Sequence, residues 1–218
     1  MPRALFQKTG NGVWISHLDL MRLFQRAFKR AGLPLTHTQG FNPRPSVSIA
    51  LPLSVGVESE CELLDFELDG VEVPCDEICD RLNAALVEGV RVLKVYKDGA
   101  KLKNLSLLRS VITLEYDQGV PEGAGEATRG LLSRPSLTVE KKGKNGVTQQ
   151  DLIPMIRSFA LREWKDTLEI ELLACCQNPT LNPMQIHAAI VCYLPQYAPD
   201  FAKCRRVELY DTNENIFR

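Results

Sequence analysis

The chain has 218 residues, is 44% hydrophobic and 24% charged, and carries a formal net charge of −1. These values are ordinary for a globular protein with a buried core, and the length fits one large domain or two domains of about 100 residues. No apolar run reaches the roughly 18 residues of a membrane span, and the first residues lack the apolar stretch of a secretory signal. We therefore expect a cytoplasmic protein with no membrane partner.

Elements of the first half follow from two apolar periodicities. Alternation predicts strands, and a 3.6-residue repeat predicts helices. In chain order we expect a strand at 3–9, a hairpin turn at 9–12, a short strand at 13–15, a helix from Ser16 or His17 to about Ala31, strands at 33–38, 47–51 and 62–68, a helix at 76–86 and a strand at 91–96. The main sequence of elements, β, α, β, β, α, β, is that of the ferredoxin-like split βαβ arrangement.

The second half, after a connector at 97–106, has a similar pattern. We expect a strand at 109–116, a helix at 122–132, a strand at 136–140, a polar turn at 141–146, a hairpin formed by 155–163 and 167–175, a helix at 182–192 and a last strand at 205–210. The sequence therefore predicts an α+β fold of two tandem ferredoxin-like units with antiparallel sheets. The first unit would cover residues 1–96, and a second, less regular unit would cover residues 107–218.

Charge is unevenly distributed along the chain. Residues 1–50 contain seven Lys and Arg and one acid, for a net charge of +6, whereas residues 51–100 contain four basic and twelve acidic residues, for a net charge of −8. A basic block beside an acidic one suggests a face that binds an anion, most commonly a nucleic acid. Alternatively, both blocks lie on solvated surfaces and partly neutralise each other.

The basic block is concentrated on the helix predicted at 16–31. Its apolar face consists of Leu20, Leu23, Phe24, Ala27 and Ala31, and its other face carries Arg22, Arg26, Lys29 and Arg30. Four cations within two turns repel one another unless an anionic group lies across them. RNA phosphates would supply such a group, and so would the acids of residues 58–72 in the same fold.

A rigid, polar loop follows this helix, with the sequence Gly-Phe-Asn-Pro-Arg-Pro at 40–45. Its two prolines fix their own φ angles and bias the residues before them toward extended conformations, so the loop loses little entropy on binding. It offers hydrogen-bonding groups and an aromatic ring that suit bases or phosphates: Gln39, Asn42, Arg44 and Phe41. Alternatively, Phe41 fills a core and Arg44 meets a glutamate of residues 58–62.

Few residues point to catalysis. His17 and Asp19 stand at the helix entrance and His37 lies past its end, where two histidines could act as general acid and base in RNA cleavage. They could equally be a helix cap and a surface residue. The sequence contains no P-loop, GxGxxG after a strand, HExxH or GxSxG. The seven cysteines have no paired zinc spacing, so we expect reduced thiols and neither metal nor cofactor in this chain.

Several segments carry a family resemblance. The segments ISHLDLMRLFQRA (15–27), RAGLPL (30–35), QGFNPRP (39–45), LPLSVGVESE (51–60) and LNAALVEGVRVL (82–93) resemble the radical SAM-linked protein family known as DUF2344. The resemblance is specific over roughly residues 3–95. It implies a separate radical SAM protein as partner and a setting in RNA processing. The chain lacks CxxxCxxC, so the radical chemistry would belong to that partner.

The leading hypothesis is therefore a non-catalytic, RNA-binding accessory to a radical SAM enzyme. Lys8, Arg22, Arg26, Lys29, Arg30 and Arg44 would contact phosphates, and Gln39, Phe41 and Asn42 would contact bases. Two alternatives stay open. One is a metal-independent endoribonuclease of the CRISPR repeat-processing type that uses His17 and His37, and the other is an adaptor that docks on the radical SAM protein.

Overall fold

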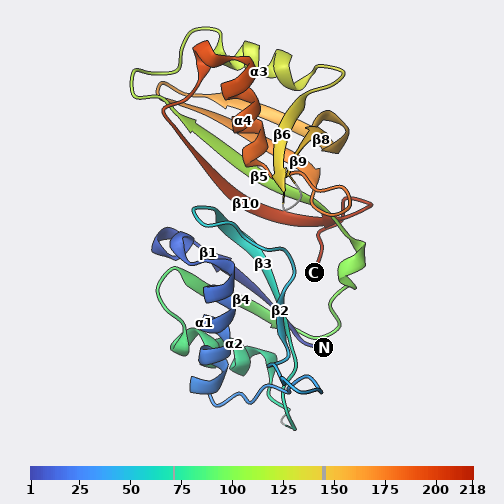
Figure 1. Ribbon diagram of the computed structural model, residues 1–218. Helices are drawn as coiled ribbons and strands as arrows, with labels where there is room; N and C mark the ends of the chain where they lie inside the picture. Colours follow the sequence, from blue (N-terminus) through green and yellow to red (C-terminus); the bar gives the residue numbers. More distant parts are fainter. Residues whose placement is uncertain (71, 144–145) are drawn as a thin grey trace. The chain divides into compact units, whose positions relative to one another are not determined.

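The computed structural model describes residues 1–70, 72–143 and 146–218. It shows a mixed α+β fold with antiparallel sheet pairing and four α-helices in the described part of the chain (Figure 1), which confirms the predicted class. The chain divides into two compact units, Met1–Leu102 with Arg218, and Lys103–Phe217. The boundary lies inside the predicted connector 97–106. Residues 144–145 of the predicted polar turn are outside the described residues.

The first unit is a four-stranded sheet with two helices. Its elements are β1 (Arg3–Lys8), α1 (His17–Arg30), β2 (Val47–Ile49), β3 (Glu58–Phe66), α2 (Cys75–Ala85) and β4 (Val90–Tyr96). The strands lie in the order β4-β1-β3-β2, and each neighbouring pair is antiparallel. Both helices pack on one face of this sheet (Figure 1). Phe24 of α1 meets Phe6 of β1 there, with ring centroids 4.8 Å apart.

Two predicted strands of this unit are wrong. The hairpin turn predicted at 9–12 and the strand predicted at 13–15 are replaced by a 3₁₀ turn, Gly10–Trp14. Gly12 packs directly on the backbone of Gly89 and leaves no room for a paired strand. Residues 33–38 make only isolated bridges, Leu35 to Leu68 and His37 to Pro45. Prolines at 34 and 45 have no N–H to donate, and this interrupts a regular ladder.

The second unit has the same order of main elements, with one insertion. Its elements are β5 (Leu105–Glu115), α3 (Ala124–Leu132), β6 (Thr138–Gly143), β7 (Gly146–Asp151), β8 (Ile156–Glu163), β9 (Thr167–Cys175), α4 (Met184–Tyr193) and β10 (Phe201–Asp211). The order β10-β5-β9-β8 is again antiparallel throughout. The β8–β9 hairpin confirms the hairpin predicted from residues 155–163 and 167–175. β6 and β7 form a separate two-stranded sheet, of which β7 was not predicted.

Candidate nucleic-acid interface

Helix α1 begins at a side-chain cap. The Ser16 hydroxyl accepts a hydrogen bond from the backbone N–H of Asp19 at 3.2 Å and donates one to the Asp19 carboxylate at 2.7 Å. These contacts satisfy a free N–H of the first turn, as the predicted N-cap requires. The pKa of Asp19 is lowered, chiefly by the Ser16 hydrogen bond and then by Arg22. The cap therefore fixes the start of the helix and the orientation of its outer face.

The outer face of α1 carries four exposed cations, two of which have a partner. Arg22 lies 3.0 Å from Asp19, in an exposed pair of the kind that contributes little to stability. Arg30 donates to the carbonyl of Ala85 at 2.6 Å, at the end of α2. Arg26 and Lys29 form no ion pair with any residue that the structure describes. The acids of residues 58–72 therefore do not neutralise this face.

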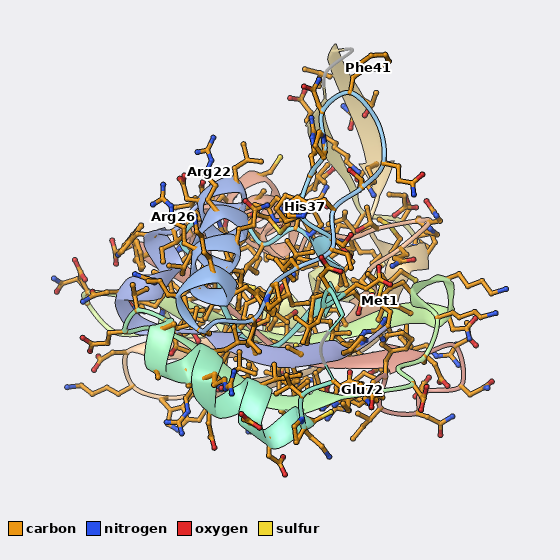
Figure 2. All side chains as sticks on the ribbon, turned by 90° about the horizontal axis from the view of Figure 1, so that it is seen from below. Met1, Arg22, Arg26, His37, Phe41 and Glu72 are labelled. Atoms are coloured by element: carbon orange, nitrogen blue, oxygen red, sulfur yellow. The ribbon has the colours of Figure 1, made fainter. Side chains whose placement is uncertain are left out.

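The loop after α1 is a closed structure, which we call the hook (residues 38–45). The backbone N–H of Thr38 donates to the carbonyl of Arg44 at 2.8 Å, and the N–H of Arg44 donates to the Thr38 hydroxyl at 3.0 Å. Phe41 projects from the hook into solvent with a relative exposure of 106% (Figure 2). The interpretation that Phe41 fills a core is therefore wrong. Within the described chain Arg44 has no carboxylate partner, and Gln39 and Asn42 are also exposed.

A pocket of about 320 Å³ lies between α1 and the base of the hook. Residues of α1 and of the segment that follows it, as far as Pro45 of the hook, line this pocket: Gln25, Phe28, Lys29, Leu33, Pro34, Leu35, His37 and Pro45. In Figure 2 the side chains of Arg22 and Arg26 and the hook all lie on the upper side, whereas the acidic Glu72 lies on the opposite side. The exposed face of α1, the pocket and the hook form one surface, which we call the basic surface.

Lys8 requires a correction. Its side chain is fully buried, with 0% exposure, and its ammonium group donates to the carbonyl of Ile15 at 3.0 Å. Lys8 therefore cannot reach an RNA phosphate at the surface. The strand alternation already places Lys8 on the same side as Ala4 and Phe6, which face the core.

The two candidate catalytic histidines do not converge. His17 is the first residue of α1, and His37 lies at the pocket beside Gln25 and Lys29, in the second half of that helix. At 1.5 Å per residue, the axial rise from residue 17 to residue 25 is about 12 Å. A general acid and a general base must both lie within hydrogen-bond reach of one reacting group. The imidazoles of His17 and His37 are too far apart along α1 to meet this condition.

No group of three or more His, Cys, Asp and Glu side chains in the described residues could hold a metal ion. No helix within residues 1–70, 72–143 and 146–218 is long and apolar enough to cross a membrane.

Comparison with known proteins places the chain in a family and gives a likeness of fold. A family described as "Uncharacterized protein conserved in bacteria (DUF2344)" matches residues 2–183, and no curated protein matches. A chain of the "Crystal Structure of a Cbf5-Nop10-Gar1 Complex" is 9% identical, with a TM-score of 0.51 over 95% of this chain and 48% of that chain. The present chain thus spans about half the length of that relative, and the likeness concerns the fold alone.

A second solved structure, the "Crystal Structure of an Unknown Protein from Galdieria sulphuraria", is 11% identical over 94% of this chain and 96% of that chain. Its TM-score is 0.25, so this likeness carries no argument.

Proposed function

The chain belongs to the DUF2344 family, and on that premise we propose that it is a non-catalytic RNA-binding accessory protein that works with a separate radical SAM enzyme in RNA modification or processing. We also propose that its two units are tandem ferredoxin-like domains, since the strand orders β4-β1-β3-β2 and β10-β5-β9-β8 arise from the same succession of strands and helices.

One observation carries the RNA-binding proposal. Cations without ion-pair partners within the described chain, Arg26 and Lys29, share a surface with an aromatic ring that is fully exposed, Phe41. Neighbouring like charges on one helix face repel each other, and large aromatic side chains usually bury much of their area. Single-stranded RNA supplies phosphates for the cations and a base for the ring, and so relieves both costs.

The radical SAM partner is supported by the resemblance of the segments at 15–27 and 39–45. Both segments belong to the basic surface. On this proposal the chain holds the RNA, and the partner supplies the cluster and the radical chemistry. The adaptor alternative assigns the same surface to a protein, so a test must separate RNA from protein as the ligand.

The test is the salt dependence of RNA affinity, measured by fluorescence anisotropy with a labelled single-stranded RNA. Each neutralised phosphate of a single strand contributes about −0.7 to the slope of log affinity against log salt. If Arg22, Arg26, Lys29 and Arg44 each contact one phosphate, the slope is about −2.8, and affinity falls about 50-fold from 50 to 200 mM salt. In Arg26→Glu/Lys29→Glu we expect weaker binding and a slope near −1.4.

The matched control is Lys94→Glu/Lys101→Glu, which makes the same change in net charge at exposed cations of the same unit. We expect its slope to stay near that of the wild type. Equal affinity and slope in the wild type and in Arg26→Glu/Lys29→Glu would refute the proposal. Capture of the radical SAM protein that survives RNase, with no RNA retained, would favour the adaptor instead.

A second variant isolates the hook. Phe41→Ala should weaken RNA binding about 5- to 100-fold, the range of one lost base stack. The thermal unfolding temperature should not change, because the ring is fully exposed and packs on nothing. Loss of stability without loss of affinity would show that the ring has a structural role.

A further inference from the structure

The pocket between α1 and the hook has an apolar interior and a polar rim. The buried side chains of Phe28, Leu33 and Leu35 contribute to its lining. Pro34 and Pro45 add further apolar surface. The polar groups are the Gln25 amide, the Lys29 ammonium and the His37 imidazole, of which Lys29 and His37 are exposed. Such a site accepts a flat apolar group that carries hydrogen-bonding atoms at its edge.

The volume limits the size of the occupant. At about 320 Å³ the pocket is at the lower end of the range for small-molecule sites, which runs from about 300 to 1,000 Å³. It can hold one ring system, and a large cofactor or an amphipathic helix would not fit. A single nucleobase has the right shape, and its edge can bond to an amide and an imidazole.

The lining of the pocket carries positive charge and no acid, which favours an anionic ligand. No acidic residue is among the eight that line it, and Lys29 on its rim forms no ion pair in the described chain. Arg26 lies one residue from Gln25 on the same helix, and it too has no ion-pair partner among the described residues. An apolar group attached to phosphates satisfies both the interior and the rim, whereas an apolar peptide would leave the cations unpaired.

We propose that this pocket binds one unstacked base of single-stranded RNA, with the phosphates on either side of that base at Arg26 and Lys29. This inference rests on the proposed RNA-binding function and specifies its ligand. A base in a duplex is paired and stacked, and it must leave the helix before it can enter such a pocket. The pocket therefore adds to the preference for single strands that base stacking on Phe41 already provides, whereas the cations of α1 alone would bind both forms.

The test compares a labelled single-stranded RNA with a duplex of the same sequence, using the full chain. We expect the single strand to bind at least about 10-fold more tightly. Gln25→Trp places a bulky ring at the pocket and should lower single-strand affinity about 5- to 100-fold, the range for one base contact. Its salt slope should stay unchanged, because the cations remain. The control is Leu93→Trp, which adds a similar ring at an exposed position of β4 in the same unit, outside the pocket lining and the basic surface.

The outcomes separate this inference from the function on which it rests. If Gln25→Trp binds like Leu93→Trp, the base pocket is refuted while RNA binding stands. If duplex and single strand bind equally, the base pocket and the stacking on Phe41 are both refuted, and phosphate binding alone stands. If neither RNA binds, both proposals fail. Thermal unfolding of both tryptophan variants shows whether a loss of affinity comes from a loss of fold. Gln25→Ala removes the amide but leaves the pocket open, so its single-strand affinity should lie between those of the wild type and Gln25→Trp.

Discussion

Gly12 tests how closely the backbone is packed in the first unit, because adding a single methyl group there would create a clash. A Cβ at Gly12 would lie 2.5 Å from the carbonyl oxygen of Gly89 and 2.8 Å from its carbonyl carbon. Both are backbone atoms, so no side-chain rotation relieves the clash. The same carbonyl accepts a hydrogen bond from the N–H of Thr9 at 2.8 Å. Gly12→Ala therefore pushes apart the end of β1 and the start of β4.

The magnitude follows from the displacement required. Ordinary van der Waals contact begins near 3.4 Å, so the two backbones must separate by almost 1 Å. Overpacking of this kind costs about 1–3 kcal/mol, and weakening the Thr9–Gly89 hydrogen bond costs about 1 kcal/mol more. We expect Gly12→Ala to lower the free energy of unfolding of the first unit by about 2–4 kcal/mol.

Urea unfolding followed by tryptophan fluorescence measures this effect. The chain has two tryptophans, and a Trp164→Phe background leaves Trp14, in the first unit, as the reporter. The control is Gly130→Ala on α3, where a Cβ meets nothing within 4 Å. In a Trp14→Phe background, with Trp164 as the reporter, that change should stabilise the second unit by about 0.5–1 kcal/mol. A free energy within about 0.5 kcal/mol of the wild type in Gly12→Ala, which is the ordinary range for an unconstrained surface position, would refute the close approach.

Three further predictions concern caps, acid stability and thiols. Ser16→Ala removes the α1 cap, so we expect a loss of about 1 kcal/mol in the free energy of unfolding and a higher pKa of Asp19 in a carboxyl NMR titration. Asp151 accepts two backbone N–H bonds that lower its pKa below the ordinary 3.8. A carboxylate whose pKa is lower in the folded than in the unfolded protein stabilises the fold at pH values above the unfolded pKa, and this stabilisation is lost as pH falls through the folded pKa. Asp151→Asn should therefore reduce the loss of stability between about pH 4 and pH 2 in urea melts. Iodoacetamide at pH 8 should alkylate exposed Cys192 well before Cys204, whose pKa burial raises to about 11, and equal rates in the folded protein would contradict the buried environment of Cys204.

Local signals in the sequence were sufficient for most of the regular elements. The capping serine at 16, the apolar period and the glycine at 32, which has a φ of +66°, together predict α1 almost to the residue. The β8–β9 hairpin was likewise predicted from alternation on both sides of a polar turn. Each of these signals acts between residues close in the sequence, where propensity and periodicity apply directly.

Features that depend on distant residues could not be found in this way. The 3₁₀ turn at 10–14 arises from contact between Gly12 and Gly89, which are 77 residues apart in the numbering. β7 pairs with β6 and has a mostly polar sequence, GVTQQD, in which no apolar alternation indicates a strand. The pocket needs α1, the segment after it and the base of the hook together. One of its lining residues, Gln25, has no signal in the sequence beyond its position on the helix.

The order of the main strands and helices is the same in the two units, but the candidate site is present in the first unit alone among the described residues. The helix that follows the first strand carries four cations in the first unit, whereas its counterpart α3 carries one arginine, Arg129, beside Glu126 at 3.7 Å. In each unit the longest insertion follows that helix, as the hook in one unit and as the β6–β7 hairpin in the other. This order of elements therefore tolerates additions at this connection, and the residues added decide what the unit can bind. Binding should consequently follow the charges of α1 and the ring of Phe41, and variants that reverse or remove these should weaken it while both units stay folded.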